Sequence, residues 1–157
     1  MTQAMRVITA KAVFDGVNLL SNKAVLIADG VIIDLIDKDK VYDATQIEDF
    51  GNSVISAGLI DLQLNGNGGV LFNDSISFAS LETMHQTNLR FGTTSYLPTL
   101  ITSDLNDVRT ALEVTKEWFK QYGNTRGVIG LHLEGPFLSK EKRGIHPLEF
   151  VTLPTDA

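Results

Sequence analysis

The chain has 157 residues, of which 43% are hydrophobic and 20% are charged, an ordinary composition for a soluble globular protein. The formal net charge of −6 argues against nucleic acid or an anionic membrane as the main partner. The absence of cysteine excludes disulfides and thiolate metal sites. No apolar run is long enough to span a bilayer and no signal-peptide pattern opens the sequence, so we expect a cytoplasmic protein.

Residues 1–55 contain short strand-like runs that are separated by turns. Asp15-Gly16 and Asp29-Gly30 are the turn signals, and the second pair, placed between two apolar runs, is a strong hairpin signal. This region therefore predicts a small antiparallel sheet.

Strands and helices alternate in residues 56–157. "AGLIDLQLNG", "TTSYLPTLI" and "GVIGLHLEGPFL" predict strands, and two helical stretches separate them. The apolar residues expected to face the core are Phe78, Leu81, Met84 and Leu89 in the first helix, and Leu105, Val108, Leu112 and Trp118 or Phe119 in the second. Ser77 and Gly92 are expected to flank the first helix and Gly123 to end the second. The alternation indicates an α/β fold with a parallel sheet.

Polar side chains gather where two of these strands end. Ile60, Leu62 and Leu64 predict an apolar face for the first strand, with Gln63 and Asn65 on the other face, and His132 and Glu134 lie on one face of the third strand. Ligands bind at the carboxyl ends of strands in barrels and in open α/β sheets alike, and inward-facing polar residues there favour a barrel.

His132 and Glu134 suit a divalent metal, because imidazole nitrogen and carboxylate oxygen both ligate Zn²⁺. A hydrogen-bonded histidine beside a solvated glutamate would give the same pattern. The amides of Gln63 and Asn65 are weak metal donors, better suited to orienting water or substrate. The nearby glycines do not complete a nucleotide-binding motif.

The loop "SKEKRGIHP", residues 139–147, follows the third strand. It reads either as a solvated charged loop or as a substrate-binding loop, in which His146 would donate to a sugar hydroxyl or a phosphate. His85, in the first predicted helix, reads as a surface or packing residue.

The ordered motifs "GLIDLQLNGNGGVLFND", "TTSYLPTLITS", "GLHLEGPFL" and "KRGIHP" closely resemble the N-acetylglucosamine-6-phosphate deacetylase family of the amidohydrolase superfamily. The resemblance implies that residues 1–55 are part of a small β-sandwich domain and that residues 56–157 are the first three units of a (β/α)₈ barrel. It implies hydrolysis of N-acetylglucosamine 6-phosphate, a small phosphorylated amino sugar, to glucosamine 6-phosphate and acetate. It also implies a homodimer for the full-length protein.

The resemblance assigns roles to individual residues. Glu134 is the implied metal ligand, and Ile145, through its backbone, and His146 would contact the sugar. Gln63 and Asn65 occupy positions where many amidohydrolases carry two metal-binding histidines, and His132 would support the cavity. The implied cofactor is a divalent metal, Zn²⁺ in the first place, with Fe²⁺, Co²⁺ or Mn²⁺ as alternatives.

The family's remaining metal ligands and its general-base aspartate have no counterpart in the sequence. We therefore expect a fragment that is inactive alone, with about three of the eight strands of a barrel. Two other functions stay open. One is an amidohydrolase acting on a cyclic amide, and the other is a truncated, non-catalytic homologue that serves in binding or assembly.

Overall fold

A computed structural model describes residues 5–41 and 46–154. The chain divides into two compact units, residues 1–57 and residues 58–157. Each unit has its own sheets and its own core, so we describe the two separately.

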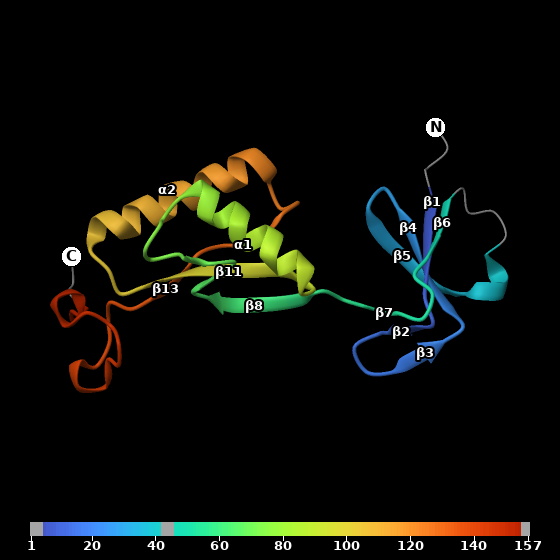
Figure 1. Cartoon of the computed structure of the whole chain (residues 1–157), viewed down its shortest axis with the longest axis horizontal. Helices are drawn as coiled ribbons and strands as arrows, with labels where there is room; N and C mark the ends of the chain where they lie inside the picture. The colour runs from blue at the N-terminus through green and yellow to red at the C-terminus, as the bar shows by residue number, and fades with distance from the viewer. Residues whose placement is uncertain (1–4, 42–45, 155–157) are drawn as a thin grey trace. The chain divides into compact units, whose positions relative to one another are not determined.

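The first unit consists of two small sheets. The four-stranded sheet has the order β5-β4-β1-β6, and the three-stranded sheet has the order β3-β2-β7 (Figure 1). The strands are β1 (Met5–Thr9), β2 (Ala12–Phe14), β3 (Leu19–Ser21), β4 (Lys23–Ala28), β5 (Val31–Asp37), β6 (Gln46–Asp49) and β7 (Val54–Ser56), with a short 3₁₀ helix η1 (Lys38–Lys40) after β5.

The expectation of an antiparallel sheet is confirmed for only part of this unit. The β4–β5 hairpin turns at Asp29 and Gly30, which both have positive φ angles (50° and 78°), as a tight two-residue hairpin turn requires. However, β6 pairs in parallel with β1, and β7 pairs in parallel with β2. The chain returns to each sheet through long connections, which local turn signals do not reveal.

The second unit is a parallel sheet with helical connections. Strands β8, β12 and β13 all pair in parallel with β11. The elements are β8 (Leu59–Leu64), β9 (Gly66–Asn67), β10 (Val70–Leu71), α1 (Phe78–Arg90), β11 (Thr93–Ile101), α2 (Leu105–Tyr122), β12 (Gly127–Val128), β13 (His132–Glu134), η2 (Lys140–Lys142) and η3 (Leu148–Phe150). The expected α/β organisation is therefore confirmed, and the third predicted strand is divided into β12 and β13.

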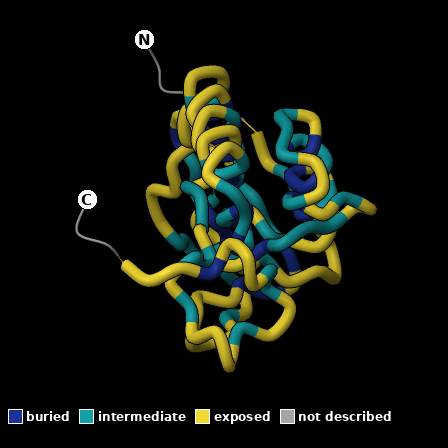
Figure 2. The backbone as a smooth tube through the Cα atoms, turned by 90° about the vertical axis from the view of Figure 1, so that its left-hand side faces the viewer, coloured by how far each residue is buried: buried dark blue, intermediate teal, exposed yellow. Residues whose placement is uncertain are grey.

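Helices α1 and α2 lie on the same side of this sheet (Figure 1). The core between them and the sheet is formed by Leu64, Phe72, Leu81, Met84, Tyr96, Leu100, Ala111, Trp118 and Val128. Burial in this unit is concentrated here, whereas the backbone toward the C-terminal end of the described residues is mostly exposed or intermediate (Figure 2). Of the described residues after Leu138, only Val151 is buried. No helix in the described ranges is long and apolar enough to cross a membrane.

The ends of both helices follow the sequence signals. The Ser77 hydroxyl accepts a hydrogen bond from the Ser80 amide at 3.2 Å at the start of α1. Gly92, just past the end of α1, and Gly123, at the end of α2, have positive φ angles of 82° and 55°. All three expected boundaries are confirmed.

The buried face of each helix matches the expected one only in part. Leu89, Leu105 and Leu112 are 48%, 68% and 51% exposed. In α1, Leu81 and Met84 are buried as expected, and the buried stripe continues through His85 and Asn88. In α2, Trp118 is buried as expected, together with Ala111 and Thr115. A pattern based on large apolar residues misses small buried residues such as Ala111 and Thr115.

The predicted apolar face of β8 is only partly used. Leu64 is buried, but Ile60 and Leu62 are 64% and 61% exposed. The pairing of β8 with β11 shifts register twice, once on either side of the Ser95–Tyr96 pairs. These irregularities break the strict alternation of side chains from which the face was predicted.

His85 is buried against Trp118, with ring centroids 6.0 Å apart in an edge-on arrangement. Burial lowers the pKa of His85; the nearby Glu82 carboxylate opposes this shift and the Arg126 guanidinium adds to it. The folded chain therefore resists protonation of this imidazole more than the unfolded chain does.

We expect the free energy of unfolding to fall as the pH drops below about 6.5, where unfolded histidine begins to bind a proton that folded His85 does not. Above that pH, His85 is neutral in both states and makes no difference. Urea unfolding at about pH 7.5 and about pH 5.5 should show a steeper loss in the wild type than in His85→Gln. An equal pH dependence in the two proteins would contradict this assignment.

Candidate active site at the carboxyl ends of the parallel strands

The polar residues picked out in the sequence come together at one edge of the parallel sheet. Ile101, the last residue of β11, pairs with Glu134 at the end of β13, and Thr99 pairs with His132. On the other side of β11, Pro98 pairs with Leu64 at the end of β8. The carboxyl ends of β8, β11 and β13 therefore meet, as expected for parallel strands.

Two segments converge on the carboxylate of Glu134. The Gln63 amide donates a hydrogen bond to Glu134 Oε2 at 3.1 Å. His146 Nε2, from the loop between η2 and η3, lies 3.6 Å from Glu134 Oε1. The His146 side chain is only 10% exposed and that of Glu134 30%, so the imidazole is held in place and the carboxylate keeps some access to solvent. The approach of His146 to Glu134 was not predicted.

The side chain of His132, on β13, is held against the central strand β11. Its Nδ1 lies 3.2 Å from the hydroxyl of Thr99 on β11. Thr99 is fully buried, so this contact fixes the edge of the ring away from solvent.

The other predicted site residues lie at the margins. The Asn65 carbonyl accepts a hydrogen bond from the Phe72 amide at 2.9 Å and thereby closes the loop after β8. Ile145 is 85% exposed beside His146. In the charged loop, the Arg143 guanidinium donates to the carbonyl of Lys140 at 3.3 Å.

Two residues that the sequence analysis missed organise this edge. The amide of Asn73 pairs with both backbone groups of Ile101, at 3.0 and 3.2 Å, and so extends the edge of β11. Thr102 is buried directly after β11 and contacts both Glu134 and His146. Their residue types are common at strand ends, and only the position of Thr102 directly after a predicted strand could have pointed to it.

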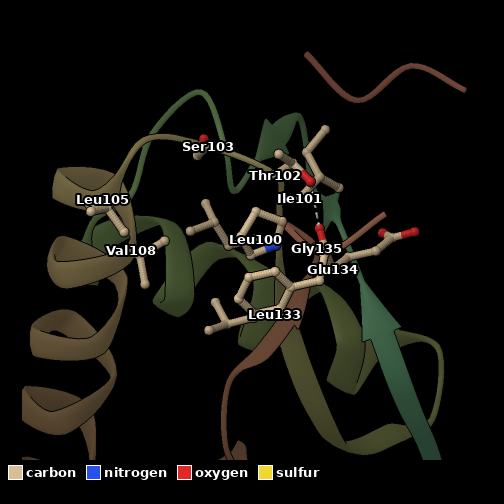
Figure 3. Close-up of a pocket in the computed structure, with 11 residues that line it drawn as sticks. Leu100, Ile101, Thr102, Ser103, Leu105, Val108, Leu133, Glu134 and Gly135 are labelled. Carbon is tan, nitrogen blue, oxygen red and sulfur yellow. Dashed lines mark hydrogen bonds between the residues drawn. The ribbon is translucent and has the colours of Figure 1, made fainter. Parts of the chain in front are cut away.

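An apolar pocket of about 160 Å³ lies between α2 and the sheet. Leu100, Leu133 and Val108 contribute to its wall (Figure 3). The carboxylate of Glu134 points away from the α2 side chains that line this pocket (Figure 3). Thr102 and Glu134 nevertheless belong to the lining of the pocket, so the pocket adjoins the polar cluster.

Comparison with known proteins gives a consistent result. No protein-family model matches the chain. It is 40% identical over 134 residues to an N-acetylglucosamine-6-phosphate deacetylase from Haemophilus influenzae, covering 85% of this chain and 35% of that protein. It is 37% identical over 141 residues to an N-acetylgalactosamine-6-phosphate deacetylase from a Shewanella species, covering 88% of this chain and 35% of that protein.

A solved structure agrees with these sequence matches. The crystal structure of N-acetylglucosamine-6-phosphate deacetylase from Pasteurella multocida superposes with a TM-score of 0.89 at 39% identity, covering 97% of this chain and 40% of that one. The present chain thus spans well under half the length of each of these proteins. By sequence and by structure, it is a homologue of the N-acetylglucosamine-6-phosphate deacetylases that corresponds to about 35–40% of their length.

Proposed function

We propose that this chain forms part of an enzyme that hydrolyses the acetamide of N-acetylglucosamine 6-phosphate to give glucosamine 6-phosphate and acetate, a step in amino-sugar breakdown. The observation that carries the proposal is the convergence of Gln63 and His146 on the carboxylate of Glu134, at the carboxyl ends of parallel strands. The names of the relatives give the substrate class.

The donor set fits one side of a divalent metal site. Glu134 offers an anionic oxygen, which suits Zn²⁺ and also Fe²⁺, Co²⁺ or Mn²⁺. The amide of Gln63 donates to the other oxygen and so orients the carboxylate. When bound, the metal would polarise the amide carbonyl and lower the pKa of a water molecule.

Glu134 is the single direct ligand that we assign in this chain. Catalytic zinc sites typically use three protein ligands and water. Within residues 5–41 and 46–154, no three His, Cys, Asp or Glu side chains are grouped to hold a metal ion. We therefore assign the remaining ligands and the general-base aspartate to polypeptide that corresponds to the rest of the relatives, and we expect the chain alone to be inactive.

The remaining site residues would bind and orient the sugar. His146 is held beside Glu134, where its Nε2 can meet a substrate hydroxyl. The exposed Ile145 leaves its backbone available next to it. His132, fixed on Thr99, supports the floor of the site. Asn65 would complete the polar wall at the end of β8.

The proposed architecture follows from the two units. We assign residues 1–55 to part of a small β-sandwich domain, because this region folds into two separate sheets. We assign residues 56–157 to the first three β/α units of a (β/α)₈ barrel, because β8, β11 and β13 are parallel and are connected through α1 and α2. A homodimer, which rests on the family resemblance, and a cytoplasmic location, which the sequence analysis leads us to expect, complete the proposal.

A second candidate substrate is the galactosamine epimer, because the Shewanella relative bears that name. The experiment uses a chimera in which this chain replaces the matching part of the Haemophilus influenzae relative. Acetate release from the two epimeric sugar phosphates is measured with zinc present. We expect faster release from the glucosamine compound; the reverse order would assign the epimer, and no release from either by a folded chimera would contradict the proposal.

In the same chimera, His146→Ala should lower kcat/KM by about 5- to 150-fold while the metal content stays unchanged. The lost hydrogen bond to the sugar accounts for about 1–3 kcal/mol of transition-state binding. Steady-state kinetics and metal analysis of the same preparation check this. Unchanged kinetics would show that His146 is a structural residue of the loop and makes no hydrogen bond to the sugar.

A further inference from the structure

The loop between β8 and α1 supplies a side chain to the edge of β11. β8 pairs with β11 only as far as Pro98, which lies opposite Leu64. Further along β11, at Ile101, the side-chain amide of Asn73 takes both backbone groups. Its Oδ1 accepts from the Ile101 N–H at 3.0 Å, and its Nδ2 donates to the Ile101 carbonyl at 3.2 Å. Asn73 thus pairs with Ile101 as a neighbouring strand would.

The direction of both hydrogen bonds is set by the backbone. An N–H can only donate and a carbonyl can only accept, so the oxygen of the Asn73 amide faces the first group and the nitrogen faces the second. Asparagine offers an acceptor and a donor in one short planar group, whereas aspartate lacks the donor and leucine lacks both. The contact with β11 therefore depends on the chemistry of this side chain as well as on its shape.

The loop holds Asn73 in place from both sides. Phe72, just before it, is fully buried in the core, and the Phe72 amide donates to the Asn65 carbonyl at 2.9 Å. After Asn73, the Ser75 amide donates to the carbonyls of Leu71 and Phe72, both at 3.3 Å. The backbone that presents the Asn73 amide to β11 is therefore already ordered, which lowers the entropy cost of its two hydrogen bonds.

Ile101 lies next to the groups that hold Glu134. It pairs with Glu134 in the register of β11 and β13. The following residue, Thr102, is 3% exposed, and its hydroxyl donates to the Glu134 carbonyl at 3.1 Å (Figure 3). The amide of Asn73 also donates to the Ser103 hydroxyl at 3.3 Å. Asn73 therefore contacts the residues on both sides of Thr102.

We propose that Asn73 is a positioning residue, which acts through Ile101 and Thr102 to fix Glu134 at the end of β13. The functional part rests on the proposed function: a fixed Glu134 binds the metal ion more tightly. Without the Asn73 amide, both backbone groups of Ile101 lose their partner, and the end of β11 and the backbone of Glu134 move more freely. Groups that orient a metal ligand typically account for about 10- to 100-fold in metal affinity or activity.

The first test measures amide hydrogen exchange by NMR in the 157-residue chain. Asn73→Leu keeps a branched side chain of the same length but removes both hydrogen bonds. Exchange at Ile101 and at Glu134 should become about tenfold faster, because the net contribution of a hydrogen bond is lost there. Exchange at Tyr96, which is fully buried on the same strand, should stay unchanged.

Three results of this measurement would overturn the proposal. Unchanged exchange at Ile101 would show that the Asn73 amide does not hold β11. Faster exchange at Ile101 alone would show that the effect does not reach Glu134. An equal increase at Tyr96 would show a general loss of stability.

The second test measures the zinc affinity of the chimera by competition with a chelator. Asn73→Leu should weaken zinc binding by about tenfold or more, and excess zinc should restore acetate release. Asn124→Leu, at an exposed turn position after α2, is the matched control and should keep the zinc affinity of the parent chimera. Unchanged zinc affinity in Asn73→Leu would contradict the positioning role. If Asn73→Leu does not fold, Asn73→Ser, which leaves room for water at Ile101, replaces it with the same expectations.

The exchange measurement does not depend on deacetylation. Faster exchange at Ile101 and Glu134, in a chain whose chimera binds no zinc, supports the link between Asn73 and Glu134 and removes only the proposed function. An active chimera whose zinc affinity does not depend on Asn73 removes the positioning role and leaves the proposed function standing.

Discussion

In the chimera, Glu134→Gln should abolish acetate release and strip the metal. Glutamine keeps the size of the side chain but loses the anionic oxygen that binds the metal. It also puts an amide group beside the amide of Gln63 and the ring of His146, which now contact the carboxylate. Removing a residue that merely orients a ligand typically costs 10- to 100-fold, so removing the ligand itself should cost more than about 100-fold.

Metal analysis and the acetate assay are made on the same preparation. Glu113→Gln is the matched control, because Glu113 is exposed on α2 and its carboxylate pairs across the helix surface with Lys116. The control should keep full metal content and rate. Stoichiometric metal and a normal rate in Glu134→Gln would show that the ligand has been assigned to the wrong residue.

The largest stability effect is expected from Trp118→Ala, which should destabilise the chain by about 3–5 kcal/mol. Trp118 is fully buried, and its ring lies 5.1 Å from Phe78 and 4.8 Å from Tyr122. Its indole N–H donates to the carbonyl of Arg126 at 3.1 Å. The substitution therefore leaves a cavity beside Phe78 and Tyr122, and it leaves the carbonyl of Arg126 without this hydrogen bond.

Urea unfolding followed by circular dichroism gives the measurement. Leu112→Ala, on the same helix, is the control, since Leu112 is 51% exposed and should change stability by less than about 0.5 kcal/mol. If Trp118→Ala leaves no folded protein, Trp118→Phe should show a smaller loss that can be measured. Equal effects of Trp118→Ala and Leu112→Ala would mean that the buried face of α2 is the one the sequence pattern predicted.

Local signals in the sequence predicted local structure well. Asp29-Gly30 gave the hairpin, and Ser77 and Gly123 marked helix ends, because each of these depends on backbone conformation within a few residues. The exposure of Leu105 and Leu112 was not predictable in this way. It depends on which side of α2 packs against the rest of the chain, and there small residues such as Ala111 are buried.

The site residues divide in the same way, into those that local sequence signals predict and those that depend on tertiary packing. Strand ends in a parallel sheet must meet, so Gln63 and Glu134 could be grouped from the sequence, and the structure joins them by a hydrogen bond. His146 reaches Glu134 from a loop whose path no periodicity describes. Thr102 could not be recognised from the sequence, because its contacts are with Glu134 and His146, which are distant along the chain. Which of these residues bind metal or sugar stays a prediction.

The most direct test of the central claim compares acetate release from N-acetylglucosamine 6-phosphate by three purified proteins. These are the 157-residue chain, the chimera and the chimera with Glu134→Gln, each verified by intact mass and analysed for metal. We predict release by the chimera only, with about one tightly bound metal ion per chain, since Gln63 and Asn65 offer no strong donors for a second ion. Robust release by the 157-residue chain alone, or by the Glu134→Gln chimera, would contradict the account.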